Sequence, residues 1–282
     1  MQTLQIEYPT DWTEYELIDS GEGMKLERFA SYTIARPDPR AIWRKNNPEI
    51  WNHADANYIR TGPTEGQWKI KKNPPAPWKV SYHGLTFVLK PTSFKHVGVF
   101  PEQAVNWDWL SEVAKNLRVL NLFAYTGGAT LASAAAGAQV THVDAVRSAI
   151  TWANENVTAS GLRGKSIRWI EEDAMKFIMR EAKRGNSYDG VILDPPRFGR
   201  GSKGEVWKIE EDLPQLLSVL KKIVKPKFVL LNAYTADLSP IVLRQLLSDW
   251  MGAIDIEFGE LALKESVRGH LLPSGIFARM SR

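Results

Sequence analysis

The second half of the chain alternates short apolar runs with longer amphipathic segments. Most of the apolar runs have the length of a strand, and the segment after each carries apolar residues at helical spacing. The alternation predicts the strands Val119–Tyr125, Gln139–Asp144, Ser166–Ile170, Tyr188–Leu193 and Lys227–Asn232. It also predicts the helices Ala129–Ala136, Ser148–Ser160 capped by Ser148, Ala174–Lys183, Glu205–Val224 kinked or divided near Pro214, and Pro240–Trp250. We therefore expect an α/β fold with a mainly parallel sheet and helices on both faces.

The two ends of the chain depart from this alternation. Around Gly269, the segments Ala253–Leu263 and Leu271–Met280 are predicted to be two strands, most simply an antiparallel pair. At the other end, glycine- and proline-rich turns separate short strand-like pieces: Tyr15–Ser20, Lys25–Phe29, Trp68–Lys71, Lys79–Tyr82 and Leu85–Lys90, with one helix at Pro39–Trp43. A helix that starts at Pro101 then opens the second domain. We expect a small β-rich substrate-recognition domain over residues 1–100 and a ligand-binding domain over residues 101–282.

Composition excludes several classes of protein. The chain of 282 residues has 44% hydrophobic residues, enough for a sizeable core, but no apolar run of membrane-spanning length. Its acidic start lacks the apolar stretch of a signal peptide. The absence of cysteine fits a reducing compartment, and we expect a cytoplasmic protein. The five histidines lack metal-ligand spacing, so we expect no metal site and no membrane partner, and we assign no oligomeric state.

The formal charge of +4 is unevenly distributed. Between Arg60 and Phe100 the only acid is Glu65, whereas seven residues are basic: Arg60, Lys69, Lys71, Lys72, Lys79, Lys90 and Lys95. Tryptophan is also concentrated before residue 110. These residues could form a nucleic-acid surface, with cations on phosphates and exposed rings on bases. The alternative is a solvated basic face whose rings fill a small core.

Chemistry-bearing residues follow the first three strands of the second domain. The turn FAYTGG follows the first strand, Asp144 ends the second, and Glu172 and Asp173 follow the third. Gly127 and Gly128 allow a positive φ and close backbone approach at a helix N-terminus. Asp144 can accept hydrogen bonds from ribose hydroxyls, and Asp173 or Glu172 from an exocyclic amine. This favours a nucleoside-containing cofactor over a helix-capping turn with two ordinary acids, and the G-x-G-x-x-G pattern of NAD sites is missing.

The fourth strand is followed by Asp194-Pro195-Pro196-Arg197. Two prolines stiffen this turn and donate no N–H, so carbonyl oxygens and the Asp194 carboxylate remain as acceptors. Such a turn suits an amine or a base edge, although a rigid turn without chemistry is the alternative. The glycine-rich loop beyond it carries Arg197, Arg200, Lys203 and Lys208. It suits a phosphate backbone or is a solvated loop.

The segments NLFAYTGG, VDA, EEDAMKF and DPPRF, in this order and spacing, resemble class I S-adenosylmethionine-dependent methyltransferases. The loop FKHVGVFPEQ narrows the resemblance to the large-subunit ribosomal RNA methyltransferase branch, over residues 94–282. The resemblance implies S-adenosylmethionine as cofactor. It also implies a Rossmann-like sheet of seven strands in the order 3-2-1-4-5-7-6, with strand 7 antiparallel. Residues 1–93 match no RNA-binding PUA module of that branch.

The resemblance also implies roles for individual residues. Tyr125 to Gly128 would hold the methionine part of the cofactor, Asp144 the ribose and Asp173 the adenine, and Gln103 with Phe100 would close over it. The full cofactor set that it implies is Phe100, Gln103, Ala124, Tyr125, Thr126, Gly127, Gly128, Asp144, Ala145, Glu172, Asp173 and Asp194. The predicted catalytic residues are Asp194, Pro195 and Pro196, and the predicted substrate-binding residues are Arg197, Phe198, Arg200 and Lys203.

These residues together predict a methyltransferase that acts on RNA. C5 methylation of pyrimidines usually needs a cysteine nucleophile. Because the chain has no cysteine, we expect a base nitrogen of ribosomal RNA as the target. Two alternatives remain: a methyltransferase of small molecules or proteins with residues 1–93 as a lid, and a non-catalytic binding module that keeps the cofactor fold.

Overall fold

The computed structural model describes residues 3–62, 65–200, 204, 206–252 and 255–282. They form two compact units, and neither unit is continuous in sequence. The α/β unit comprises residues 1–7, 105–261 and 274–282, and the β unit comprises residues 8–104 and 262–273. The units therefore differ from the two continuous domains expected from the sequence. The chain passes from the β unit to the α/β unit between residues 104 and 105, close to the expected boundary at residue 100.

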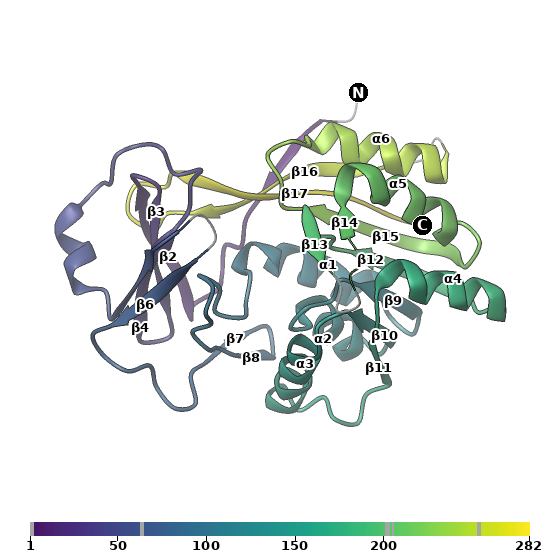
Figure 1. Cartoon of the computed structure of the whole chain (residues 1–282), viewed down its shortest axis with the longest axis horizontal. Helices are drawn as coiled ribbons and strands as arrows, with labels where there is room; N and C mark the ends of the chain where they lie inside the picture. The colour runs from purple at the N-terminus through teal and green to yellow at the C-terminus, as the bar shows by residue number, and fades with distance from the viewer. Residues whose placement is uncertain (1–2, 63–64, 201–203, 205, 253–254) are drawn as a thin grey trace. The chain divides into compact units, whose positions relative to one another are not determined.

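An eight-stranded sheet is the centre of the α/β unit (Figure 1). Its strands are β1 (Gln5–Glu7), β9 (Arg118–Leu122), β10 (Gln139–Asp144), β11 (Ile167–Glu171), β12 (Tyr188–Leu193), β15 (Val224–Ala233), β16 (Glu257–Lys264) and β17 (Leu271–Ser281). They lie in the order β1-β16-β17-β15-β12-β9-β10-β11. Strands β9 to β12 and β15 pair in parallel, and β17 is antiparallel to β15. The sheet has one strand more than the expected seven, because β1 pairs with β16 at the edge.

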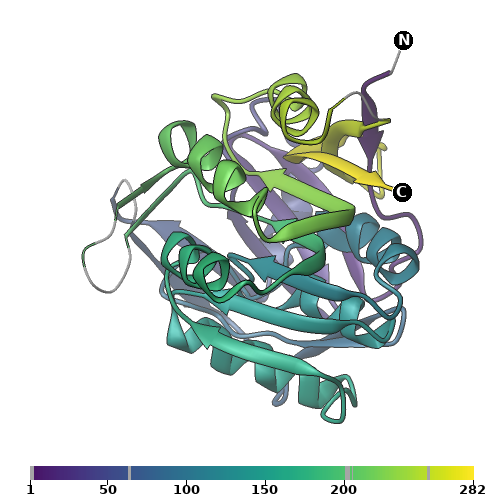
Figure 2. The ribbon, with the colours of Figure 1, turned by 90° about the vertical axis from the view of Figure 1, so that its right-hand side faces the viewer.

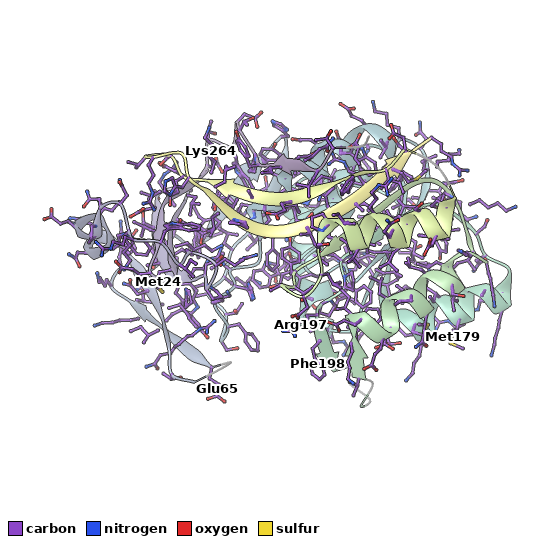
Figure 3. All side chains as sticks on the ribbon, turned by 90° about the horizontal axis from the view of Figure 1, so that it is seen from above. Met24, Glu65, Met179, Arg197, Phe198 and Lys264 are labelled. Carbon is purple, nitrogen blue, oxygen red and sulfur yellow. The ribbon has the colours of Figure 1, made fainter. Side chains whose placement is uncertain are left out.

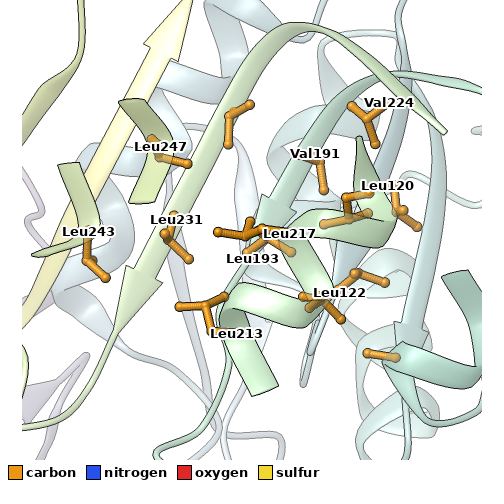
Figure 4. Close-up of a cluster of buried hydrophobic side chains, with 14 of the residues drawn as sticks. Leu120, Leu122, Val191, Leu193, Leu213, Leu217, Val224, Leu231, Leu243 and Leu247 are labelled. Atoms are coloured by element: carbon orange, nitrogen blue, oxygen red, sulfur yellow. The ribbon is translucent and has the colours of Figure 1, made fainter. Parts of the chain in front are cut away.

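Helices cover both faces of this sheet (Figure 2). They are α1 (Ala104–Val113), α2 (Gly128–Ala135), α3 (Arg147–Ala159), α4 (Ala174–Arg184), α5 (Ile209–Leu220) and α6 (Pro240–Met251). On one face, α5 and α6 bury leucines against strand residues such as Leu193 and Leu231 (Figure 4), and α4 buries Phe177 and Ile178 in the same cluster. On the other face, Thr130 of α2 bonds to Asn121 of β9, and Trp109 of α1 packs edge-on against Phe228. Within the described ranges, no helix has both the length and the apolar character that a membrane crossing requires.

Three of the expected helix positions in the chain are wrong. Helix α5 begins at Ile209, because the preceding residues Val206–Lys208 form β14 and pair with β13 (Phe198–Arg200) in an antiparallel hairpin. Helix α3 begins after Val146, which makes no side-chain cap, so Ser148 is not the N-cap. The expected helix at Pro39–Trp43 does not form, and a 3₁₀ helix follows instead.

The β unit is built on a five-stranded sheet in the order β2-β3-β4-β5-β6. Its strands are β2 (Tyr15–Gly21), β3 (Met24–Phe29), β4 (Tyr32–Pro37), β5 (Ala56–Arg60) and β6 (Gly66–Ile70), beside a hairpin of β7 (Lys79–Tyr82) and β8 (Leu85–Val88). The 3₁₀ helices are η1 (Pro48–His53) and η2 (Pro101–Gln103). The hairpin agrees with the sequence prediction, whereas β4 and β5 were not predicted. Polar residues interrupt both strands, so neither has the apolar run that marks a strand.

A buried ionic cluster is the main polar feature of the β unit. Arg36 donates from two nitrogens to the two carboxylate oxygens of Glu27, one bond measuring 2.9 Å, and the Tyr15 hydroxyl donates to the same carboxylate at 2.9 Å. Lys25 lies 3.5 Å from Glu27. Burial by itself raises the pKa of Glu27, but the charges of Arg36 and Lys25 outweigh it and lower that pKa to about 2.

We predict that Glu27→Gln destabilises the β unit at neutral pH. The substitution leaves Arg36 buried beside a neutral group, and breaking such a pair costs about 3–5 kcal/mol of unfolding free energy. In the parent protein, the ionised Glu27 carboxylate contributes fully to the free energy of unfolding above its pKa in the unfolded chain, near 4.5. This contribution is lost as pH falls towards its pKa in the folded protein, about 2. Urea unfolding followed by circular dichroism at pH 7 and pH 3 measures both effects.

The matched control for this prediction is Glu16→Gln. Glu16 pairs with Arg28 at 2.9 Å, but both side chains are about one-third exposed. Its loss should stay below about 1 kcal/mol because water screens the pair. Equal losses for the two variants at pH 7 would show that the buried cluster does not stabilise the unit.

Candidate functional site

The ends of four neighbouring parallel strands meet at one edge of the eight-stranded sheet. Leu122 of β9 is in register with Val143 of β10 and with Leu193 of β12, and Val143 is in register with Ile170 of β11. The residues that follow these strands are therefore neighbours along that edge. The chain runs from β9 to β10 and β11 on one side and then returns to β12 on the other. The topological switch point, where open α/β sheets bind ligands, therefore lies beyond the ends of the neighbouring strands β9 and β12.

The turn after β9 has an unusual backbone held by Asp144. Phe123 and Tyr125 have φ values of 58° and 47°, in the left-handed region that side chains disfavour. The Tyr125 N–H donates to Oδ2 of Asp144 at 2.8 Å, and the Val146 N–H donates to Oδ1 at 2.8 Å. Asp144 thus anchors the turn after β9 and the approach to α3 at the same time. Burial raises the pKa of Asp144, and the backbone N–H groups of Val146 and Tyr125 oppose that rise.

The two glycines of this turn are needed for different reasons. Gly127 has a φ of 86° and precedes the first residue of α2, as the sequence predicted. Gly128 is helical and has no positive φ, so that part of the prediction is wrong. A Cβ atom at Gly128 would lie 2.7 Å from the Trp107 ring. Close packing of α1 against α2 therefore accounts for Gly128.

Two residues near the turn were missed by the sequence analysis. Asn156 of α3 is fully buried, and its Nδ2 donates to the Thr126 carbonyl at 2.9 Å. Trp152, one helical turn earlier, places its ring 6.4 Å from that of Tyr125. An asparagine within the buried stripe of an amphipathic helix is a signal that could have identified the first of them. Both support the turn from the α3 side.

Two acids follow β11 and differ in their roles. Asp173 is the N-cap of α4, and its Oδ1 accepts the Lys176 N–H at 2.9 Å. Glu172 accepts a hydrogen bond from Arg180 on Oε1 at 2.5 Å. Its Oε2 is buried and has no hydrogen-bond partner among the described residues. A buried carboxylate oxygen without a donor fits a ligand amine at this position.

The Asp194-Pro195-Pro196 turn is held by a tryptophan from the hairpin beyond it. Trp207 of β14 donates from Nε1 to the Pro196 carbonyl at 2.7 Å. Its ring lies 4.9 Å from that of Phe123, which belongs to the turn after β9. Trp207 thus contacts both segments that border the switch point. The sequence analysis assigned this residue to a helix and missed its role.

The basic loop is only partly available for a substrate. Arg197 forms an ion pair with Asp237 at 2.5 Å, and Lys208 pairs with Glu211 at 2.8 Å. Phe198 is 53% exposed next to Arg197 (Figure 3). The predicted Lys203 and the side chain of Arg200 lie outside the described residues. Substrate binding by this loop stays a prediction.

Phe100 and Gln103 belong to the β unit rather than to the α/β unit. Phe100 precedes η2, its ring lies 5.2 Å from that of His96, and Gln103 is buried. Their predicted closure over the cofactor stays a prediction. The residues within the α/β unit already fit a nucleoside, because Asp144 ends β10, two acids follow β11, and the first N–H groups of α2 lie at the same edge.

The chain matches the family model of S-adenosylmethionine-dependent methyltransferases over residues 58–247. It is 34% identical over 146 residues to ribosomal RNA large subunit methyltransferase K/L of Shewanella baltica, which is 51% of this chain but 20% of that protein. The Shewanella frigidimarina protein of the same name is 33% identical over 146 residues, again 51% of this chain and 20% of that protein. The chain therefore spans about a fifth of the length of these curated relatives.

Solved structures of methyltransferases have the same fold as this chain. The crystal structure of a SAM-dependent methyltransferase from Agrobacterium tumefaciens superposes with a TM-score of 0.92 and 41% identity, over 100% of this chain and 97% of that one. The putative methyltransferase SMU.776, complexed with SAH, shares the fold with a TM-score of 0.76 at 16% identity, over 96% of this chain and 76% of that one. The strand ends of the α/β unit suit a nucleoside, and the family model matches more than half of the chain. This chain therefore belongs to the S-adenosylmethionine-dependent methyltransferases.

Proposed function

We propose that this protein transfers a methyl group from S-adenosylmethionine to a nitrogen atom of an RNA base. The observation that carries the proposal is the Asp194-Pro195-Pro196 turn, which follows β12 beside the turn after β9. Its acceptors are the kind that an amino group or a base edge can use, and it borders the strand ends that suit the cofactor. Acceptor and cofactor sites are thus adjacent at the switch point.

Residues of the α/β unit would hold the cofactor. The turn Ala124–Gly128 would receive the methionine part, with Asp144 and Ala145 at the ribose and Glu172 or Asp173 at the adenine amine. When bound, S-adenosylmethionine supplies a methyl group on a positively charged sulfur. Phe100 and Gln103 are proposed as further cofactor-binding residues.

Asp194 and the Pro195 carbonyl are proposed to orient the methyl acceptor. Both are hydrogen-bond acceptors, so they can take the N–H groups of an amine and leave its lone pair directed at the methyl group. Methyl transfer needs an in-line approach, and fixing that geometry before reaction is a large part of catalysis. The negative charge of Asp194 also stabilises positive charge that develops on the attacking nitrogen.

RNA is favoured as the substrate by two observations. The curated relatives carry the name ribosomal RNA large subunit methyltransferase K/L. The loop after Pro196 is rich in basic residues in the sequence, and Phe198 within it is exposed, which suits a nucleotide chain. The sequence holds no cysteine, so a cysteine-dependent attack on a pyrimidine ring is excluded.

The function is tested by tritiated methyl transfer from S-adenosylmethionine into ribosomal RNA, transfer RNA, protein and small-molecule fractions of a methyl-deficient lysate. We expect label in ribosomal RNA, at a base nitrogen after digestion to nucleosides. Label confined to protein or to small molecules would contradict the RNA substrate. Label at cytosine C5 would contradict the nitrogen target.

We predict that Asp194→Asn lowers the turnover number by about 10²–10³, the loss typical of removing one electrostatic group from an active site. Calorimetric affinity for S-adenosylhomocysteine should stay close to that of the parent protein, since the proposal assigns Asp194 to the methyl acceptor, although the resemblance also included it in the cofactor set. The control is Asp189→Asn, because Asp189 lies at the opposite end of β12, where it accepts the Arg118 N–H at 2.9 Å. Parent-like turnover in Asp194→Asn would remove this residue from the mechanism.

We predict that Asp144→Asn weakens binding of S-adenosylhomocysteine about tenfold or more. The carboxylate can accept charge-assisted hydrogen bonds from hydroxyls, each contributing about 1.5–3 kcal/mol. Asparagine also offers one oxygen for the two backbone donors, so the turn loses part of its support. Isothermal titration calorimetry of this variant and of Asp189→Asn measures the difference, and equal affinities would contradict the ribose assignment.

Trp207 is proposed as a positioning residue, tested by Trp207→Phe. Phenylalanine keeps a ring against Phe123 but cannot donate to the Pro196 carbonyl. Losing one such hydrogen bond corresponds to roughly three- to tenfold in rate. We expect kcat to fall by this factor while affinity for S-adenosylhomocysteine is unchanged. Trp250→Phe, on the partly buried side of α6, is the control, and an equal loss there would point to general destabilisation.

A further inference from the structure

A groove lies on the five-stranded sheet of the β unit. Its volume is about 680 Å³, which is within the range of sites that hold small ligands. Met24 and Pro37, neighbours on β3 and β4, line its apolar part. Asn57 and Ile59 of β5 and Lys69 of β6 line it further along the sheet. We refer to this feature as the β5–β6 groove; Met24 is labelled in Figure 3.

Strand pairing places the polar and apolar residues of the β5–β6 groove on one face. Asn57 lies opposite Lys69 and Ile59 opposite Gln67 in the antiparallel pair. Since side chains alternate between faces, these four residues point to the same side of the sheet. Ile59 is 44% exposed there. The groove therefore combines an exposed aliphatic surface with an amide and an ammonium group.

The charge of the β5–β6 groove is of one sign. Arg60, Lys69 and Lys71 are among its lining residues, and no acid is. Lys71 donates from Nζ to the Asn52 carbonyl at 2.9 Å, which holds its side chain beside the sheet. In the described part of the chain, Arg60 and Lys69 have no ion pair. Asp55 and Glu65, the acids nearest to them in sequence, are not lining residues.

Most cations on the neighbouring strands of the same sheet are, by contrast, neutralised by acids. The pairs are Lys25 with Glu27 and Asp38, Arg28 with Glu16, Arg36 with Glu27, and Arg40 with Asp38. Among the described strands of this sheet, the cations without an acidic partner, Arg60 and Lys69, thus belong to the β5–β6 groove. A polyanion is the complementary partner, because it gains attraction that no side chain of the unit supplies.

We propose that the β5–β6 groove binds a single-stranded segment of the RNA substrate. Phosphates would lie on Lys69 and Lys71, and a sugar or base face on Ile59. An RNA strand offers anionic and apolar surfaces in alternation, as the groove does. This inference rests on the proposed function and adds which part of the protein binds a segment of the substrate other than the methylated base.

Aromatic stacking contributes little to this groove. The Tyr58 hydroxyl donates to the Ser93 carbonyl at 3.1 Å, and its ring meets that of Trp68 at 5.3 Å. Tyr58 is buried, so its ring is not a platform for bases. Binding is therefore governed by phosphates, with weak sequence preference and strong salt dependence.

The proposal is tested with fluorescein-labelled oligo(U) of twelve nucleotides and fluorescence anisotropy. The double variant Lys69→Glu/Lys71→Glu should raise the Kd about tenfold or more at 100 mM salt. It should also reduce the slope of log Kd against log salt concentration by about 1.4, the value for two lost phosphate contacts on a single strand. The control Lys115→Glu/Lys165→Glu changes charge equally at exposed lysines outside the groove and should bind within about twofold of the parent protein.

Each outcome decides the proposal. Parent-like binding by the groove variant, or equal loss in both double variants, would overturn it. Polyglutamate that binds the parent protein as tightly as oligo(U), with the same loss in the groove variant, would assign the groove to an acidic peptide instead. Circular dichroism spectra and urea unfolding midpoints that match those of the parent protein show that the fold of both variants is intact.

The experiment also separates this inference from the proposed function. If oligo(U) binds through the groove but no RNA fraction is methylated, the RNA-binding role of the groove is supported and the proposed RNA substrate of methyl transfer is contradicted. If ribosomal RNA is methylated and the groove variant keeps both RNA binding and turnover, the proposed methyl transfer is supported and the RNA-binding role of the groove is contradicted.

Discussion

The carboxylate of Asp144 is the contact on which the candidate site depends. It accepts one N–H from the turn after β9 and one from the approach to α3, so a single side chain fixes two loops at the sheet edge. The left-handed residues Phe123 and Tyr125 are unfavourable by themselves, and strain of this kind persists where surrounding contacts determine the backbone. The parallel register of β9 and β10 brings donor and acceptor together. The site is therefore set by strand pairing before any ligand binds.

The same register explains why acceptor and cofactor chemistry belong together. Leu193 pairs with Leu122, so the turn after β12 starts beside the turn after β9. Trp207 adds a second link, since it bonds to the Pro196 carbonyl and packs against Phe123. A methyl acceptor and a methyl donor must meet within a few ångströms, and rigid elements on both sides of the switch point provide that precision.

The β unit uses its charges in two ways. The cluster around Glu27 is buried and internally neutralised, and it gives the sheet a polar core that only one strand arrangement satisfies. The cations of the β5–β6 groove are exposed and lie at the edge of the same sheet. The basic residues that look alike in sequence thus separate into a structural group and a group that can contact a partner. Of the rings in this region, Trp78, Tyr82 and Phe87 fill the core, whereas Phe94 is 61% exposed.

What the sequence determined by itself was local. The alternation of apolar runs and helical segments, Gly127 as a left-handed turn residue, and acids directly after strands follow from periodicity and turn chemistry, which act over a few residues. The tertiary structure decided which distant residues complete the site. Trp107 against Gly128, Asn156 on the Thr126 carbonyl and Trp207 on the Pro196 carbonyl depend on pairs far apart along the chain, and β1 is a strand only because β16 pairs with it. Such contacts form when folding brings the partners together, so no local pattern predicts them.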